Sequence, residues 1–151
     1  MPLAWRWCRF EALGVDGVYD MLALRAKVFI LEQGPYLDPD GADRHAWHLL
    51  GRETTSGALM AYLRVLDPGL KFDDASIGRV VVDAGLRGQG IGHQLVREAL
   101  GQCARLWPGQ SISISAQAHL QRFYGQHGFQ TVSDEYPDDG TPHVDMRRSN
   151  A

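Results

Sequence analysis

Hydrophobic positions in the middle of the chain follow first a strand pattern and then a helix pattern. Residues 77–82 include Ile77 and three consecutive valines, a β-branched run that is typical of a buried strand. Between Ile91 and Trp107, apolar residues recur at three- and four-residue spacing, which predicts an amphipathic helix. Residues 83–92 lie between these segments and are rich in glycine. The pattern therefore predicts a strand, a glycine-rich turn and a helix in succession.

The flanking segments predict further strands and helices on both sides of this unit. We expect strands at residues 3–10, 46–52, 57–66, 111–115, 131–136 and 143–147. We expect helices from about Asp16, as N-cap, to Ile30, and from Ala118 to His127, where Gly128 ends the helix. This order predicts one domain over residues 1–151, of the α/β class (α+β, with a mixed sheet).

Composition excludes several function classes. The 151 residues carry a formal net charge of −3 and no basic patch that could neutralise phosphates, so we do not expect the protein to be a dedicated nucleic-acid binder. No apolar run reaches the ~18–20 residues of a membrane span, and we expect no secretory signal. Cys8 and Cys103 are far apart in apolar settings, which is typical of reduced thiols in a cytoplasmic protein.

Two groups of polar residues resemble metal ligands but lack the required pattern. Asp38, Asp40 and Asp43 lie in a loop over residues 34–44, and Gly41 is misplaced for an EF-hand, so we expect a solvated loop. His45 and His48 lie three apart in an expected strand and would point to opposite faces. We therefore expect no metal site.

The glycine-rich turn carries the first candidate chemistry. Glycines allow the backbone to approach a ligand, and a helix N-terminus offers unpaired N–H groups to an anion. The turn lacks the lysine of a P-loop, and the third glycine of a dinucleotide fingerprint would fall on His93. The alternative interpretation is a tight strand-to-helix turn that binds no ligand. The spacing Arg87-x-x-Gly90-x-Gly92 resembles the coenzyme A diphosphate loop of the GNAT superfamily of N-acetyltransferases.

A second motif at the expected separation extends the resemblance. Residues 117–129 are similar to the GNAT segment NxxAxxxYxxxGF and keep Tyr124, Gly128 and Phe129, with Gln117 in place of asparagine. Shorter similarities to the ElaA-type branch include Pro35-Tyr36, Tyr62-Leu-Arg64 and Ile77-Gly-Arg79-Val. Gly34 stands where that branch often has cysteine, so any role for that thiol is absent.

The resemblance implies a GNAT fold in which two central strands separate and the pantetheine arm of acetyl-CoA fills the wedge. The arm would pair with the backbone of Val80, Val81 and Val82, near Gln117. The diphosphate would lie on amides of Gly88, Gln89, Gly90, Ile91, Gly92 and His93, with Arg87 at the entrance. A primary amine of a small molecule or peptide would then attack the thioester, whose carbonyl a backbone N–H polarises.

Two protons must move in such a reaction. An alkylamine has a reference pKa of ~10.4, so its deprotonation at pH 7 costs roughly 4–5 kcal/mol. Tyr124 stands where the family places the acid that protonates the CoA thiolate; the alternative is a core aromatic residue. Candidates for the base are Glu32, His48 and His143, although a structural role is the better interpretation of each histidine.

Two questions stay open from the residues alone. Arg64 and Arg79 either face solvent or line the acceptor cleft. The enzyme hypothesis also has an alternative, a non-catalytic acyl-CoA-binding sensor that uses the same pocket. Aromatic residues near the N-terminus would permit a homodimer.

Overall fold

A mixed β-sheet forms the centre of the computed structural model, which describes residues 2–34 and 36–149. Pro35, part of the resemblance above, lies outside the described residues. The strands are β1 (Leu3–Arg9), β2 (Ala46–Glu53), β3 (Leu59–Leu66), β4 (Ala75–Val82), β5 (Ile112–Gln117), β6 (Phe129–Thr131), β7 (Tyr136–Asp138) and β8 (Thr141–Arg148). Their order in the described sheet is β1-β2-β3-β4-β5-β8-β6, with β7 paired to β8. The mixed α/β class is confirmed.

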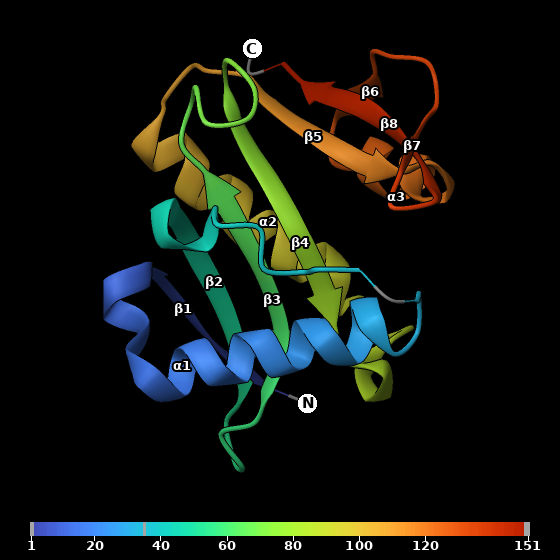
Figure 1. Ribbon diagram of the computed structural model, residues 1–151. Coiled ribbons are helices and arrows are strands. Elements are labelled where there is room, and N and C mark those ends of the chain that lie inside the picture. Colours follow the sequence, from blue (N-terminus) through green and yellow to red (C-terminus); the bar gives the residue numbers. More distant parts are fainter. Residues whose placement is uncertain (1, 35, 150–151) are drawn as a thin grey trace.

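Helices cover both faces of the sheet (Figure 1). On one face lies α1 (Phe10–Arg25), which continues as a π-helical turn over Ala26–Ile30. On the other lies α2 (Ile91–Leu106), whose apolar stripe faces β2, β3 and β4. The short α3 (Gln121–Gly125) packs near β6. Short 3-10 turns occur at Asp43–His45, Ala84–Leu86 and Ala118–Leu120. Among the described helices, none has the length and apolar character needed to cross a bilayer.

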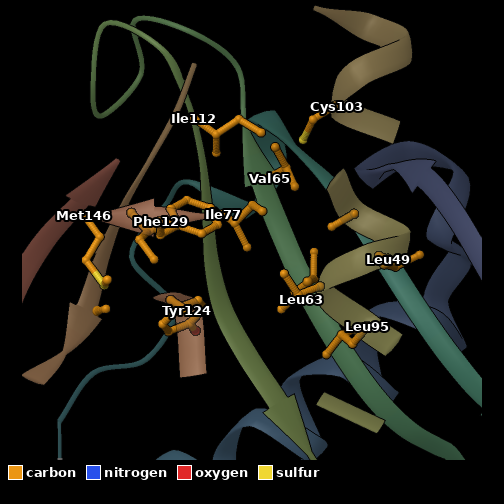
Figure 2. Close-up of a cluster of buried hydrophobic side chains, with 14 of the residues drawn as sticks. Leu49, Leu63, Val65, Ile77, Leu95, Cys103, Ile112, Tyr124, Phe129 and Met146 are labelled. Atoms are coloured by element: carbon orange, nitrogen blue, oxygen red, sulfur yellow. The ribbon is translucent and has the colours of Figure 1, made fainter. Parts of the chain in front are cut away.

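Alternation along the strands divides the apolar side chains into two clusters. On β3, Tyr62 packs in the cluster under α1, whereas its neighbour Leu63 packs in the cluster under α2. Figure 2 shows the second cluster, in which Ile77 of β4 lies between Leu63 and Phe129. The cluster therefore joins the β1–β4 part of the sheet to the β5–β8 part. Cys8 and Cys103 are both buried, as predicted, and lie in different clusters.

Most predicted elements are confirmed, and the differences fall at chain reversals. The helix expected from about Asp16 begins at Phe10, and Gly14, with φ 74° and ψ 171°, interrupts it. The strand expected over residues 131–136 is wrong: β6 ends at Thr131, and Tyr136 begins β7. Strands β7 and β8 form a hairpin through Asp139 and Gly140, both with positive φ, so the expected strand at residues 143–147 begins earlier, at Thr141.

Candidate active site

The two central strands separate after a short parallel pairing. Ala75 and Ser76 of β4 lie in register with Ile112 and Ser113 of β5, and the strands then diverge (Figure 1). The cavity between them encloses about 260 Å³. Its walls include residues 76–80 of β4 and residues 114–117 of β5. The edge of β4 that faces this wedge therefore offers backbone groups that can pair with an extended ligand.

A bulge in β4 shapes the same wall of the cavity. Opposite β3, Tyr62 pairs with Val81 and Arg64 pairs with Gly78, so β4 has one residue more than β3 over this interval. Arg79 absorbs the extra length with a φ of 52°, a left-handed conformation that is uncommon for a residue with a Cβ. The structure places Val80 on the cavity wall; Val81 lies in the cluster under α1.

The glycine-rich turn lies at the carboxyl end of β4, beyond the cavity wall. Gly88 and Gly90 have φ values of 81° and 78°, and Gly90 is the N-cap of α2. In such a helix the first amide groups have no partner within the helix, and the macrodipole adds partial positive charge there. Gly92, in the first turn of α2, lies against the Phe123 ring, which an added Cβ would approach to 3.4 Å. The turn can hold an anion such as a diphosphate.

Arg87, at the entrance of this turn, is paired with Glu32. Its Nη1 and Nη2 donate to Oε1 and Oε2 of Glu32 at 2.8 and 3.1 Å. This contact lowers the pKa of the Glu32 carboxyl. Glu32 thus lies at the glycine turn and does not line the cavity, so the structure separates it from the other acceptor-side candidates.

Tyr124 reaches the cavity from α3. Its side chain is 7% exposed and packs edge-on against Phe123 and Phe129, with ring centroids 5.0 and 6.0 Å apart. Burial raises its pKa, and among the described residues none forms a hydrogen bond with its hydroxyl. The phenol is therefore protonated at neutral pH and free to donate to a group inside the cavity.

His93 and Gln117 also have partners that their sequence positions do not reveal. His93 shares a 2.8 Å hydrogen bond between its Nδ1 and Nε2 of His127, and its ring stacks on Phe123. Gln117 lines the cavity and donates from Nε2 to Oε1 of Gln33 at 3.1 Å. The His93 side chain therefore connects α2 to the segment that follows α3, and its backbone amide is one of the first amides of α2.

The expectation of a solvated aspartate loop is wrong, because Arg25 draws two of the aspartates into the interior. Asp38 and Asp43 are 4% and 7% exposed. The fully buried Arg25 donates to Asp38 Oδ2 at 2.8 Å and to Asp43 Oδ1 at 2.7 Å. Each buried charge has an opposite partner, which offsets the cost of desolvation.

Arg64 and Arg79, which line the cavity, form ion pairs with the aspartates of the same loop. Arg64 donates to Asp40 Oδ2 at 2.6 Å and to Asp43 Oδ1 at 3.0 Å, and Arg79 donates to Asp38 Oδ1 at 2.8 Å. The hydrogen bond from Arg64 holds the pKa of Asp40 well below its usual range. Both arginines line the cavity, and each is already paired with aspartates of this loop.

The two histidine candidates have different surroundings. His48 is fully buried and does not line the cavity: its Nε2 donates to the Asp43 carbonyl at 2.9 Å, and its Nδ1 accepts from the Tyr62 hydroxyl at 2.6 Å. Burial lowers its pKa. His143 lines the cavity, and its Nδ1 donates to the Thr141 carbonyl at 2.8 Å, which leaves Nε2 as the basic nitrogen.

Sequence reasoning missed several polar residues of the cavity. Lys71, Ser115, Asp138 and Asp139 contribute to its walls. The strict alternation of residues 111–115 places every second side chain on one face, and this pattern could have identified Ser115. Lys71 and the two aspartates belong to loops and turns, whose placement depends on tertiary contacts. In the described part of the chain, no group of three or more His, Cys, Asp or Glu side chains is arranged to hold a metal.

Comparison with known proteins identifies related chains over nearly the whole length. Residues 54–149 match a family model described as an acetyltransferase (GNAT) domain. The chain is 39% identical to protein ElaA of Escherichia coli over 149 residues, which cover 97% of this chain and 96% of that one. The crystal structure of E. coli ElaA has a TM-score of 0.90 and covers 97% of this chain and 99% of its own.

Two further structures extend the comparison. The crystal structure of an acyl-CoA N-acyltransferase from Pseudomonas aeruginosa has a TM-score of 0.92 at 43% identity, and the match covers 97% of this chain and 99% of that one. An aminoglycoside 6'-N-acetyltransferase complexed with coenzyme A has a TM-score of 0.71 and covers 97% of each chain. At 14% identity, the last similarity shows the fold alone.

Proposed function

The chain belongs to the GNAT acetyltransferase family, in its ElaA-like branch, and we propose that it transfers an acetyl group from acetyl-CoA to a primary amine by direct attack. Family membership makes the protein an acyltransferase that uses an acyl-CoA. The nature of the acceptor, a small molecule or an exposed peptide amine, and the roles of individual residues belong to the proposal.

One observation carries the proposal most directly: the wedge between β4 and β5 combines a free strand edge with the hydroxyl of Tyr124. An extended pantetheine arm fits the edge of β4 near Val80, Val81 and Val82, since its amides can replace the missing strand. Gln117 contributes a polar side chain to the opposite wall. The thioester then lies within the cavity that Tyr124 lines.

The glycine-rich turn supports the placement of the diphosphate. Residues 91–93 form the first turn of the 16-residue α2, whose amides have no partner within the helix. Gly88 and Gly90, just before it, provide left-handed backbone positions where a side chain is disfavoured. Arg87 is 46% exposed and can turn from Glu32 toward a phosphate. Two negative charges at this end of the helix complement its dipole.

Tyr124 suits the role of general acid. The attacking amine forms a C–N bond with the acetyl carbon, the C–S bond breaks, and the departing thiolate needs a proton. The Tyr124 phenol is neutral at pH 7 and, with no other partner among the described residues, can hydrogen-bond to the sulfur and donate its proton as the C–S bond breaks. The parent thiol of the leaving group has a pKa near ~8.5. The N–H of the central strand stabilises the negative charge that develops on the acetyl oxygen.

Of the proposed acceptor-side residues, His143, Arg64 and Arg79 line the cavity. His143 presents a basic nitrogen, whereas Arg64 and Arg79 position the aspartate loop beside the acceptor. His48 and Glu32 have structural partners outside the cavity, and we assign them no contact with the acceptor. The two buried cysteines support a reducing, cytoplasmic setting.

Release of free thiol from acetyl-CoA in the presence of a panel of primary amines tests the proposal. An enzyme gives thiol release that depends on amine concentration and yields the acetylated amine in a mass spectrum. A non-catalytic acyl-CoA sensor binds acetyl-CoA with no such release, and that result would reject the proposal.

A further inference from the structure

A chain of hydrogen bonds leads from the cavity to a carboxylate on β8. Ser115 lines the cavity from β5, and its Oγ is hydrogen-bonded to the hydroxyl of Tyr136 on β7. The Tyr136 hydroxyl donates to Oδ1 of Asp145 on β8 at 2.6 Å. Ser115 and Asp145 are direct partners in the antiparallel β5–β8 pairing, so their side chains share one face of the sheet.

The directions of these hydrogen bonds follow from the carboxylate. An ionised carboxylate can only accept hydrogen bonds, so the Tyr136 hydroxyl donates its one proton to Asp145. The hydroxyl of Ser115 must then donate to the oxygen of Tyr136. The remaining lone pairs of Ser115 are thereby left to accept a hydrogen bond from a donor in the cavity. A protonated amine is such a donor.

We propose that Ser115, Tyr136 and Asp145 form a relay that removes the proton from the acceptor amine. The inference rests on the proposed amine acetylation and supplies the missing base of that reaction. Ser115 contacts the amine, whereas Tyr136 and Asp145 act through Ser115. The relay selects primary amines that bind as ammonium ions.

The proton balance closes without a further reactant. The ammonium gives one proton to the Ser115 hydroxyl. Ser115 passes its own hydroxyl proton to Tyr136, and Tyr136 passes its proton to Asp145. A neutral amine and a protonated Asp145 result. After attack, Tyr124 gives its proton to the departing thiolate, and the second proton of the nitrogen restores the neutral Tyr124 phenol. Asp145, which is partly exposed, returns its proton to solvent.

Several charged groups surround this chain. His143 of β8 stacks on the Tyr136 ring, with centroids 6.3 Å apart, and its Nε2 lies 4.0 Å from Asp138 Oδ2 on β7. Lys71, in the loop between β3 and β4, lies in the field of Asp138 and Asp145. From the loop after β6, the Ser133 hydroxyl accepts from the Asp145 amide at 2.8 Å. Because His143 is itself a candidate base, the experiment must separate it from the relay.

The test compares thiol release by the wild type, Tyr136→Phe and His143→Gln, with acetyl-CoA and the amines n-butylamine, benzylamine and trifluoroethylamine. Tyr136→Phe keeps the ring that stacks on His143 and removes only the hydroxyl. Asp145→Asn keeps an acceptor for Tyr136 but removes the negative charge. Ser115→Ala is paired with Ser115→Thr, which keeps a hydroxyl, and with Ser113→Ala as a control two residues along β5.

We expect Tyr136→Phe, Asp145→Asn and Ser115→Ala to lower kcat/KM for n-butylamine by about 10²-fold, the range of lost acid–base catalysis. The acid limb of the pH profile should move up toward the pKa of the free amine, a change that a purely structural role would not produce. The weakly basic trifluoroethylamine should be affected least. Ser115→Thr should retain activity, and Ser113→Ala should match the wild type.

Two results would overturn the relay in distinguishable ways. If the wild type acetylates amines and the acid limb moves in His143→Gln but not in Tyr136→Phe, the proposed function stands and the relay is wrong. If the wild type releases no thiol with any of these amines, the proposed function and the relay both fail.

Discussion

Arg87 and Glu32 form a two-pronged ion pair at 2.8 and 3.1 Å beside the turn to which we assign the diphosphate. The pair brings a carboxylate close to the place where a dianionic group would bind. Our assignment therefore requires Arg87 to exchange Glu32 for the diphosphate when CoA binds. Both side chains are exposed to solvent, so breaking this ion pair costs little free energy.

Replacement of this carboxylate should strengthen CoA binding. Glu32→Gln removes a competitor for Arg87 and a charge that repels phosphate, and we expect the Kd for CoA to fall by about two- to fivefold at low salt. Isothermal titration calorimetry measures the change, and Glu11→Gln on α1 is the control. Weaker binding by Glu32→Gln would mean that Arg87 needs Glu32 to reach the diphosphate.

Negative charge at Gly90 should weaken CoA binding beyond the effect of backbone strain. Gly90 has a φ of 78°, so any side chain there is strained, and Gly90→Glu and Gly90→Gln share that strain and nearly the same size. We expect the Kd for CoA to be at least about tenfold higher for Gly90→Glu than for Gly90→Gln, because the carboxylate repels the diphosphate. Equal CoA affinities of the two folded variants would place the diphosphate elsewhere.

Loss of the Tyr124 hydroxyl should affect catalysis more than stability. Tyr124→Phe removes a hydroxyl that has no partner among the described residues, so we expect kcat to fall by about 10²-fold or more with little change in CoA affinity or Tm. Tyr62→Phe is the matched control, since its buried hydroxyl donates to His48 at 2.6 Å.

The control should show the opposite pattern. Tyr62→Phe leaves the buried Nδ1 of His48 without its donor, so we expect a loss of about 1–3 kcal/mol in the free energy of unfolding and a normal kcat. Urea unfolding and thiol release measure the two effects. A normal kcat in Tyr124→Phe would remove Tyr124 from the mechanism.

The aspartate loop should make stability depend on pH in the acid range. Arg64 holds the pKa of Asp40 well below its usual range in the folded protein. Such a group contributes stability that is present above its unfolded pKa of about 3.9 and is lost as the pH falls toward the folded value. We expect the free energy of unfolding to decrease below about pH 4. Asp40→Asn should be about 1 kcal/mol less stable at pH 7 and should lose less stability on acidification.

Urea unfolding at pH 7 and pH 3 tests this expectation, and the exposed Asp73 supplies the control variant Asp73→Asn. An equal loss of stability on acidification in Asp40→Asn and the wild type would show that the Asp40 carboxyl does not contribute to the pH dependence.

Local patterns predicted the parts of the site that depend on neighbours in the sequence. The valine run, the glycine-rich turn and the apolar stripe of α2 are contiguous, so period and composition suffice to identify them. Tyr124 was found by its spacing from Gly128 and Phe129 in a motif, and the structure places it on the cavity.

Partners far apart in the sequence could not be predicted in the same way. Arg79 and Asp38 are 41 residues apart, and Tyr136 and Ser115 are 21 apart. The charge of Asp38 alone suggested a solvated loop, because only the folded chain brings Arg25 to it. Buried ion pairs and hydrogen-bond chains of this kind are properties of tertiary structure, and a single sequence holds no local signal for them.

A crystal structure of the protein with CoA would show whether the wedge between β4 and β5 holds the cofactor. We predict the diphosphate within hydrogen-bond distance of amides of residues 88–93, the pantetheine arm along the edge of β4 at Val80, and the sulfur beside the Tyr124 hydroxyl. A diphosphate bound elsewhere, or a pantetheine arm outside this wedge, would contradict the proposed site.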